Sequence, residues 1–450
     1  MNNPEMHQRG SFATKFGVIA AIAGSAIGLG NIWKFPYETG QNGGAAFILV
    51  YLLLMLVIGV PVMISEFIIG RQSRKNPVGA FKALKPKSKW KYVGVLGIAA
   101  SFLILAFYSA IGGWTLEYIR LSVINQFDGM NAQDLHTLYA NFVSNPGFPI
   151  LWQSLFMILT VVIVMLGVEK GIERYTKYLM PLLFVLLVVL CIRSVTLPNA
   201  SKGLSFLFNP DFTKIDQKVV INALGQVFFS LSLGMGTLIT YGSYIRKEVN
   251  LTTTAIKVSF VDTLVAILAG IAIFPAVFSL GFNPAEGTGL VFIVLPQVFY
   301  SMPFGQILAI LFFILLTIAS ITSSISLLEV VVAYLIEERH LKRKKATIIA
   351  GAATMIMAVL CSLSFANNSV FRTDSGTLFD FVVYLTNNIM LPLGGLCIVI
   401  FLGWRLNKNI IYKQLGAEKQ SFWIRLFMFI IKFVAPIAII LVFLSAINIL

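Results

Sequence analysis

Long apolar stretches separated by short polar loops run through this chain from end to end. Each stretch is long enough to cross a membrane as a helix, and hydropathy predicts about eleven such spans. Their centres lie roughly at Ala26, Leu56, Ala106, Leu159, Leu186, Leu231, Leu268, Leu316, Met355, Met390 and Ile437. Because backbone polar groups cannot be left unpaired in lipid, spans of this length must be helical. The sequence therefore predicts an all-α polytopic membrane protein with 11 transmembrane helices.

The formal net charge of +15 allows two interpretations, a nucleic-acid partner or a membrane topology signal. The lysines and arginines gather in short loops on alternate sides of the spans, as the positive-inside rule predicts. The largest such loop, between the second and third spans, holds Arg71, Arg74, Lys75, Lys82, Lys85, Lys87, Lys89 and Lys91. We therefore expect a lipid bilayer and no nucleic acid as partner, with a cytoplasmic N-terminus.

The first span carries an unusual glycine-rich run from Ala23 to Pro36. Gly24, Gly28 and Gly30 crowd its middle, and each glycine in a helix costs roughly 1 kcal/mol relative to alanine. An opened turn survives in lipid only where its polar groups line a cavity or bind something. Freed carbonyls suit a small cation, and the start of a half-helix suits a carboxylate. Close helix packing through small residues is the alternative interpretation.

The sixth span repeats this pattern, since Leu231 to Thr237 also places Gly-x-Gly at mid-span. The two copies are offset by five spans, an odd number, so they enter the membrane from opposite sides, as an inverted five-plus-five repeat requires. We predict a cytoplasmic tail at 1–12, five-helix repeats at 13–197 and 215–406, and an eleventh helix at 420–450. Matched breaks point to a midplane binding site; coincidence among glycine-rich helices is the alternative.

Beyond these patterns, the run from Ala23 to Pro36 followed by Asn42-Gly43-Gly44 resembles the sodium-coupled neurotransmitter and amino-acid symporters, in their bacterial branch. Further matches are Gly59-Val60-Pro61 to Glu66, Tyr108 with Trp114, Phe229 to Gly234, and Thr322-Ser323-Ser324. The resemblance covers nearly the whole chain. It implies a leucine-transporter-like fold with broken helices 1 and 6, alternating access, and a place in the bacterial inner (plasma) membrane. It implies a transporter and not an enzyme.

The resemblance also implies two sodium sites. The first would use Ala26, Asn31, Ser230 and Asp262 together with the substrate carboxylate, and the second would use Gly24, Ile27, Ala319, Thr322 and Ser323. Both sets supply only oxygen ligands, which suit a hard cation. A mid-span hydroxyl bonded to the carbonyl one turn back is the ordinary structural interpretation of Thr322 and Ser323.

Asp262 departs from the pattern of the family's chloride-dependent members. They have asparagine there and a chloride-binding serine one turn later, where this chain has Ala266. An aspartate within a span by default marks a functional site, so we expect Asp262 to supply the negative charge itself and transport to be chloride-independent. A position near the cytoplasmic end of the span is the alternative explanation for Asp262.

The family's substrate pocket maps onto residues of four spans: Ser25, Ala26, Gly28, Gly30, Ile104, Tyr108, Phe229, Ser230, Ser232, Met235, Ser323 and Leu327. The resemblance places the substrate α-carboxylate near Gly28, Gly30 and the Tyr108 hydroxyl. No aspartate stands at Ser25 to bind an amine, and the lining is apolar, so a hydrophobic amino acid is favoured. Because Met235 adapts to size, we favour a large or aromatic side chain. A small aliphatic substrate, or a sensor or channel on this scaffold, is the alternative.

The expected gates also come from the resemblance. At the cytoplasmic face Arg9 would pair with Glu337, helped by Tyr244. At the outer face Lys34 replaces the family's arginine and Val383 its aspartate, which leaves either Asp380 or the aromatic pair of Tyr108 and Phe229 to close the site. A further pair, Gly171 and Pro181, matches a family motif at which the fifth helix unwinds; a simple helix start is the alternative.

Overall fold

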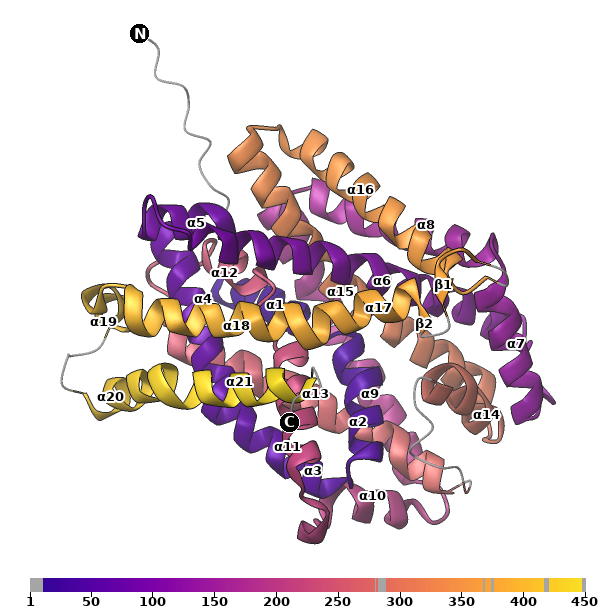
Figure 1. The fold of residues 1–450 in the computed structure, drawn as a ribbon. Coiled ribbons are helices and arrows are strands. Elements are labelled where there is room, and N and C mark those ends of the chain that lie inside the picture. Colours follow the sequence, from indigo (N-terminus) through magenta and orange to yellow (C-terminus); the bar gives the residue numbers. More distant parts are fainter. Residues whose placement is uncertain are drawn as a thin grey trace.

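The computed structural model describes residues 11–279, 281, 289–366, 369–373, 376–416 and 421–446. Long helices lie side by side in one bundle (Figure 1). The strands β1 (Arg372–Thr373) and β2 (Gly376–Thr377) pair antiparallel in a small hairpin, an addition to the predicted all-α fold. The helices α5 (Pro77–Leu84) and α19 (Lys408–Leu415) lie at one end of the bundle, and the hairpin and α7 (Ala132–Ser144) lie at the other (Figure 1).

Within the described residues, nine unbroken helices are long and apolar enough to span a membrane. They are Ala45–Ser73 (α3 to α4), Lys91–Val123 (α6), Phe148–Met165 (α8), Val168–Val195 (η3 and α9), Leu251–Ser279 (α13), Gly305–Arg339 (α15), Arg343–Leu363 (α16), Leu378–Arg405 (α17 to η7) and Phe422–Ser445 (α20 to α21). Exposed leucines and isoleucines on α8, including Leu151 and Ile158, suit contact with lipid.

Two further spans are interrupted. In the first, α1 (Lys15–Ala26) is followed by η1 (Gly30–Lys34) and α2 (Phe35–Gln41), and the two halves are bent by 53°. In the second, α11 (Gln217–Ser230) and α12 (Thr237–Gly242) are separated by six residues outside any helix. The first pair brings the number of candidate spans in the described residues to ten, and the second pair makes the fold consistent with the predicted eleven.

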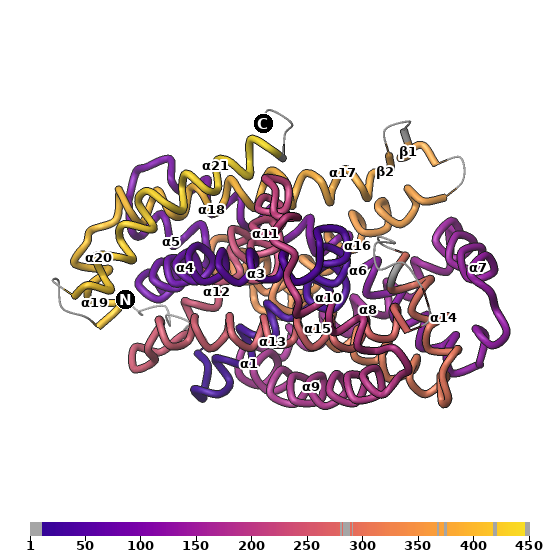
Figure 2. The backbone as a smooth tube through the Cα atoms, turned by 90° about the horizontal axis from the view of Figure 1, so that it is seen from below, coloured from indigo at the N-terminus to yellow at the C-terminus, as the bar shows by residue number. Residues whose placement is uncertain are grey.

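The interrupted spans are the first and the sixth, at equivalent positions of the two halves. The helix α1 packs against α9, α13 and α15, and α12 packs against α4. The third and eighth spans, α6 and α15, pack together along their length. Figure 2 shows α17, α18 (Leu391–Ile400) and α21 (Ala435–Ala446) on one flank and α9 (Arg174–Val195) on the other, with α12, α13 and α15 between them. The breaks therefore lie inside the bundle.

The remaining helices are short and connect the spans: α10 (Ala200–Phe208), η4 (Phe212–Lys214), η5 (Leu290–Val294) and α14 (Leu295–Tyr300). The elements α10 and η4 fall between the two proposed five-helix repeats. The repeat boundaries at 197 and 215 stay predictions.

Candidate functional site

The first break begins where α1 ends at Ala26. Ile27 has a ψ angle of 105°, so its carbonyl turns out of the helical direction. The N–H of Leu29 does not continue the helix and instead donates to the Tyr108 hydroxyl at 2.9 Å. Bared carbonyls therefore precede the break and a bared N–H follows it, as the glycine-rich sequence predicts.

The carbonyls of this break face two hydroxyls of α15. Ser323 Oγ lies 3.4 Å from the Gly24 oxygen and 3.3 Å from the Ile27 oxygen. Thr322 Oγ1 lies 3.5 Å from the Ile27 oxygen and 3.0 Å from that of Ala319. The five residues named for the second sodium site thus lie together. Their ligand atoms are all neutral oxygens, a set that fits a hard monovalent cation.

The residues named for the first sodium site form a second buried cluster. Asn31 Nδ2 donates to Asp262 Oδ1 at 2.8 Å and lies 3.3 Å from Ser230 Oγ. Ser230 Oγ donates to Asp262 Oδ2 at 2.8 Å, and the Tyr51 hydroxyl donates to the same oxygen at 3.3 Å. The side chains of Asn31 and Asp262 are fully buried. Asp262 therefore lies inside the polar centre of the bundle and not at a solvent-exposed helix end.

Tyr51 was not singled out from the sequence. A buried tyrosine hydroxyl usually finds a polar partner, so its position in an otherwise apolar span was a usable signal. Asn31 joins this cluster to the first break, because its Oδ1 accepts the N–H of Gly28 at 3.3 Å. Ala26, the fourth predicted ligand, lies at the end of α1 and lines the adjoining cavity.

The second break differs in backbone geometry. Ser232, Gly234 and Gly236 have φ angles of 54°, 80° and 77°, all in the left-handed region. Glycine adopts such angles without steric cost. For Ser232 the same conformation costs roughly 1–2 kcal/mol. The chain between α11 and α12 is therefore a true irregular segment that needs support from its neighbours.

Side chains of two other spans support that segment. The fully buried Glu66 of α4 (Val60–Ser73) accepts the Gly234 N–H through Oε1 at 2.7 Å. Ser101 of α6 donates through Oγ to the Met235 oxygen at 2.6 Å. A buried backbone group left without a partner costs about 1–3 kcal/mol. Sequence analysis noted Glu66 within a motif but gave it no role.

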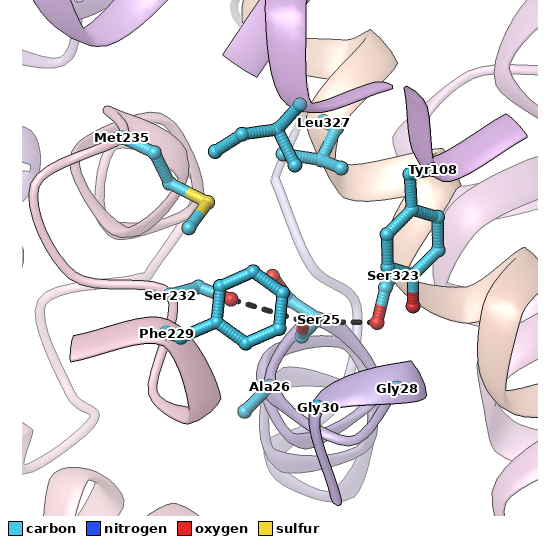
Figure 3. Close-up of a pocket in the computed structure, with 11 residues that line it drawn as sticks. Ser25, Ala26, Gly28, Gly30, Tyr108, Phe229, Ser232, Met235, Ser323 and Leu327 are labelled. Carbon is cyan, nitrogen blue, oxygen red and sulfur yellow. Dashed lines mark hydrogen bonds between the residues drawn. The ribbon is translucent and has the colours of Figure 1, made fainter. Parts of the chain in front are cut away.

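Between the two breaks lies a small cavity of about 20 Å³. Its lining contains every predicted pocket residue except Ser230, which belongs to the Asp262 cluster: Ser25, Ala26, Gly28, Gly30, Ile104, Tyr108, Phe229, Ser232, Met235, Ser323 and Leu327. The Ser25 carbonyl accepts from Ser232 Oγ at 3.1 Å and from Ser323 Oγ at 3.2 Å (Figure 3). One carbonyl thus joins the two breaks and α15.

The cavity has a polar side and an apolar side (Figure 3). The polar side holds Gly28 and the hydroxyls of Tyr108 and Ser323, and a Cβ on Gly28 would lie 2.3 Å from Ser323 Oγ. The opposite side holds the thioether of Met235 and the Leu327 side chain. This arrangement suits a small amphipathic molecule with one charged end.

Comparison with known proteins agrees with this geometry. The sequence profile described as the Sodium:neurotransmitter symporter family matches residues 9–134 and 130–450. The chain belongs to the sodium:neurotransmitter symporter family. It is 40% identical over 441 residues to a sodium-dependent transporter of Bacillus subtilis, YhdH, which covers 98% of each chain. It is 38% identical to a sodium-dependent transporter of Haemophilus influenzae, over 97% of this chain and 98% of that one.

A solved structure shares the fold of this symporter. The crystal structure of MhsT in complex with L-phenylalanine superimposes with a TM-score of 0.90 at 46% identity, and covers 97% of this chain and 100% of that one. The family is thus shown by sequence, and the leucine-transporter-like fold by structure. The relatives are transporters, as the sequence predicts.

On the side of the bundle that is predicted to be cytoplasmic, the structure shows a polar cluster that the sequence did not predict. Arg343, at the start of α16, pairs with the fully buried Glu329 of α15 at 2.5 Å. The Tyr244 hydroxyl donates to the same carboxylate at 2.6 Å. Phe12 packs edge-on against Tyr244, with ring centroids 6.0 Å apart. Tyr244 therefore contacts Glu329, which the sequence did not single out.

Of the two residues predicted to pair in the cytoplasmic gate, Glu337 belongs to the described part of the chain. Glu337 accepts the N–H and the side-chain amide of Asn76 at 2.8 and 2.9 Å. Arg9 lies outside the described residues. The pairing of Arg9 with Glu337 stays a prediction.

On the side of the bundle that is predicted to face outward, the structure shows contacts that bear on the choice that the sequence left open. Lys34 Nζ lies 4.7 Å from the ring centroid of Phe229. Asp380 accepts the N–H and hydroxyl of Thr377 at 3.0 and 2.7 Å and so caps its own helix, α17 (Leu378–Tyr384). Lys34 lines an outer vestibule of about 720 Å³, while Phe229 lines the cavity. The geometry thus pairs Lys34 with an aromatic ring and leaves Asp380 in a local structural role.

Gly171 and Pro181 belong to the fifth span, which packs against α1 near the oxygen cluster of Gly24 and Thr322. Gly171 is in the π-helical segment η3 (Val168–Glu173), and Pro181 is inside the helix α9 that follows it. Side chains of Thr176 and Met180, between the two, contact the position of Gly24. The fifth span is thus irregular at its start and packs directly against the first break.

Proposed function

We propose that this protein is a sodium-coupled symporter that imports a hydrophobic amino acid with a large or aromatic side chain and does not need chloride. The observation that carries the proposal is the cavity between the two breaks. Its polar side adjoins both oxygen clusters, and its apolar side contains Ile104, Phe229, Met235 and Leu327. The structural likeness to MhsT, which was crystallised with L-phenylalanine, supports an aromatic substrate.

The opposite charges of sodium and of the substrate carboxylate explain how the binding of one would be coupled to the binding of the other. In the proposal, one sodium ion binds among Ala26, Asn31, Ser230 and Asp262, and the substrate carboxylate completes its shell. A second ion binds among the carbonyls of Gly24, Ile27 and Ala319 and the hydroxyls of Thr322 and Ser323. The bared carbonyls have only neutral hydroxyls as partners in the structure, and a bound ion would give them a charged one. Sodium would therefore order the breaks before the amino acid closes the site.

Chloride independence rests on Asp262. Its carboxylate already holds the hydroxyls of Tyr51 and Ser230, the donors that an anion in this cluster would need. Ala266, one turn along α13, is fully buried and offers no polar group. A fixed negative charge can balance sodium without a mobile anion. We expect Asp262→Asn to lose sodium-driven uptake, or to regain part of it only when chloride is present.

The apolar residues of the cavity favour a hydrophobic substrate. The cavity volume of about 20 Å³ is little more than a water molecule needs, so a large amino acid requires side chains to move. Met235 has three rotatable bonds and can supply such movement. Selectivity for small aliphatic amino acids is the alternative that this small volume favours.

Gating in the proposed cycle uses different chemistry on the two sides. On the outer side, Phe229 under Lys34 would cover the amino acid. On the cytoplasmic side, the ion pair of Glu329 with Arg343 and its hydrogen bond from Tyr244 would have to separate for release. Breaking a buried pair leaves an unpaired charge unless water enters, which keeps the inner side closed until the bundle opens.

Uptake in proteoliposomes tests the proposal. Labelled phenylalanine should accumulate against its gradient only under an inward sodium gradient, equally well in chloride and in gluconate. Competition by all common amino acids should rank aromatic and large aliphatic side chains first. Strongest competition by alanine or glycine would favour the small-substrate alternative. Saturable binding without accumulation would identify a sensor, and uptake that does not saturate would identify a channel.

A further inference from the structure

The turn between α5 and α6 carries lysines that the proposed transport site does not use. The turn covers residues 85–90, and the exposed lysines in or beside it are Lys82, Lys85, Lys87, Lys89 and Lys91. Lys82 forms an ion pair with Glu338 at 2.5 Å. Within the described part of the chain, no acidic side chain lies within ion-pair distance of the other four. Four neighbouring positive charges repel one another and attract an anion.

These lysines surround two adjoining hollows. The first has a volume of about 380 Å³ and is lined by Lys82, Lys85, Lys87, Ser88, Lys89, Lys91 and Tyr92. The second has a volume of about 480 Å³ and is lined by Lys85, Ser88, Lys89, Trp90, Val93 and Arg405. Both are large enough for a phosphodiester, and they share Lys85, Ser88 and Lys89.

The backbone that carries the lysines is ordered by local contacts. Ser88 Oγ donates to the Lys85 oxygen at 2.7 Å, and the Tyr92 N–H donates to the Lys89 oxygen at 3.1 Å. Trp90 packs edge-on against Phe401 of η7 (Phe401–Arg405), with ring centroids 5.2 Å apart. The turn is therefore anchored to the tenth span, which also brings Arg405 to the second hollow.

The second hollow is cationic on one side and apolar on the other. Lys85, Lys89 and Arg405 supply charge, while Trp90 and Val93 supply apolar surface. Aromatic side chains nearby are largely exposed, at 59% for Tyr92 and 58% for Trp404, and tryptophan and tyrosine gather at the level of lipid headgroups. Such a lining matches an amphipathic anion better than a free one.

We propose that this lysine turn binds the headgroup of an anionic phospholipid, such as phosphatidylglycerol, in the membrane leaflet at this end of the bundle. The lysines and Arg405 contact the phosphate, and the glycerol and first acyl carbons lie along Trp90 and Val93. Clusters of basic side chains beside a membrane span are typical of such recognition, with about a fivefold gain in affinity per charge. The site rests on the membrane location and not on the proposed substrate.

Native mass spectrometry of the full-length protein, with phosphatidylglycerol or phosphatidylcholine added, tests this proposal. The site variant replaces Lys85, Lys87 and Lys89 with glutamine. The matched control replaces Lys342, Lys344 and Lys345, three exposed lysines at the N-terminus of α16 (Arg343–Leu363), with glutamine. Because three charges are removed at about fivefold each, we expect the site variant to bind phosphatidylglycerol on the order of 100-fold more weakly, and the control to stay within twofold of the wild type.

Three results would overturn the proposal. Equal losses of phosphatidylglycerol binding in the two triple variants would mean a general charge effect. Binding of phosphatidylcholine as tight as that of phosphatidylglycerol would mean that the site does not distinguish the two headgroups. Displacement of phosphatidylglycerol by millimolar inorganic phosphate would identify a site for a soluble anion. Exchange of the same three lysines for arginine keeps the charge and should keep binding, which separates loss of the site from loss of folding.

Discussion

The two interrupted spans look alike in sequence, yet glycine serves a different purpose in each. In the first break, Gly28 has a φ angle outside the left-handed region, and what it provides is room, since a Cβ would lie 2.3 Å from Ser323 Oγ and 2.4 Å from the Tyr108 hydroxyl. In the second break, Gly234 has a φ of 80° and its N–H is held by Glu66. The first glycine lets ligand groups approach, and the second lets the chain change direction.

The two breaks also present different chemical groups to the site. The short first break exposes carbonyls toward hydroxyls of α15, an arrangement for cations. The longer second break is stabilised from outside by Glu66 and Ser101, and it presents Ser232 and Met235 to the cavity. We therefore expect changes in the first break to affect ion binding, and changes in the second to affect the shape of the substrate cavity.

The largest expected effect is that of Gly28→Ala. The added methyl group would lie 2.3 Å from Ser323 Oγ and 2.4 Å from the Tyr108 hydroxyl and would push both groups out of the site, so uptake should fall on the order of 100-fold. The control is Gly225→Ala in α11, where a Cβ meets no atom within 4 Å. Initial rates of sodium-driven phenylalanine uptake measure both. A Gly28→Ala variant with near wild-type uptake would refute the space argument.

Replacing Glu66 should have the next largest effect, because its carboxylate satisfies the buried N–H of Gly234. Glu66→Ala should lower uptake about tenfold or more, chiefly by raising KM, since the unpaired N–H costs about 1–3 kcal/mol. Glu66→Gln keeps an acceptor oxygen and should retain most activity. Equal damage from the two substitutions would show that charge, and not the hydrogen bond, supports the second break.

Thr322→Val removes one hydroxyl of the first-break oxygen cluster while keeping the side-chain shape. If that hydroxyl is an ion ligand, the sodium concentration for half-maximal uptake should rise about tenfold, with little change in the apparent affinity for amino acid at saturating sodium. Thr354→Val in α16 is the control, since the Thr354 hydroxyl bonds only to the Ala350 carbonyl one turn back. Indistinguishable sodium curves for the two variants would remove Thr322 from the ion site.

The smallest expected effect is that of Ser232→Gly. The substitution relieves a left-handed φ, worth roughly 1 kcal/mol, but it loses the hydrogen bond to the Ser25 carbonyl, also worth about 1 kcal/mol. Thermal unfolding in detergent should therefore change by little. Ser232→Ala loses the bond without relieving the backbone and should unfold at a lower temperature. A stabilised alanine variant would mean that this bond between the breaks contributes nothing.

The sequence was most informative where a function needs a particular residue type at a fixed spacing. Gly24, Asn31 and Asp262 stand out because glycine, amide and carboxylate are unfavourable within a span unless they are used. The resemblance then grouped the cavity lining, and the structure gathers the same residues apart from Ser230. The resemblance did not show which side chains pair with one another. On the side predicted to face outward, for example, Asp380 caps its own helix and Lys34 lies over Phe229.

The amino-acid sequence by itself determined the membrane-spanning helices, the two points of interruption and the residue types around them, because hydropathy and helix-breaking composition act locally along the chain. Only the tertiary structure decided which buried polar groups satisfy one another. The pairs are Tyr51 with Asp262, Glu66 with Gly234, and Glu329 with both Tyr244 and Arg343, and the partners are far apart in the chain. Helix packing sets those distances, since any buried polar side chain must find a partner but no local pattern says which one.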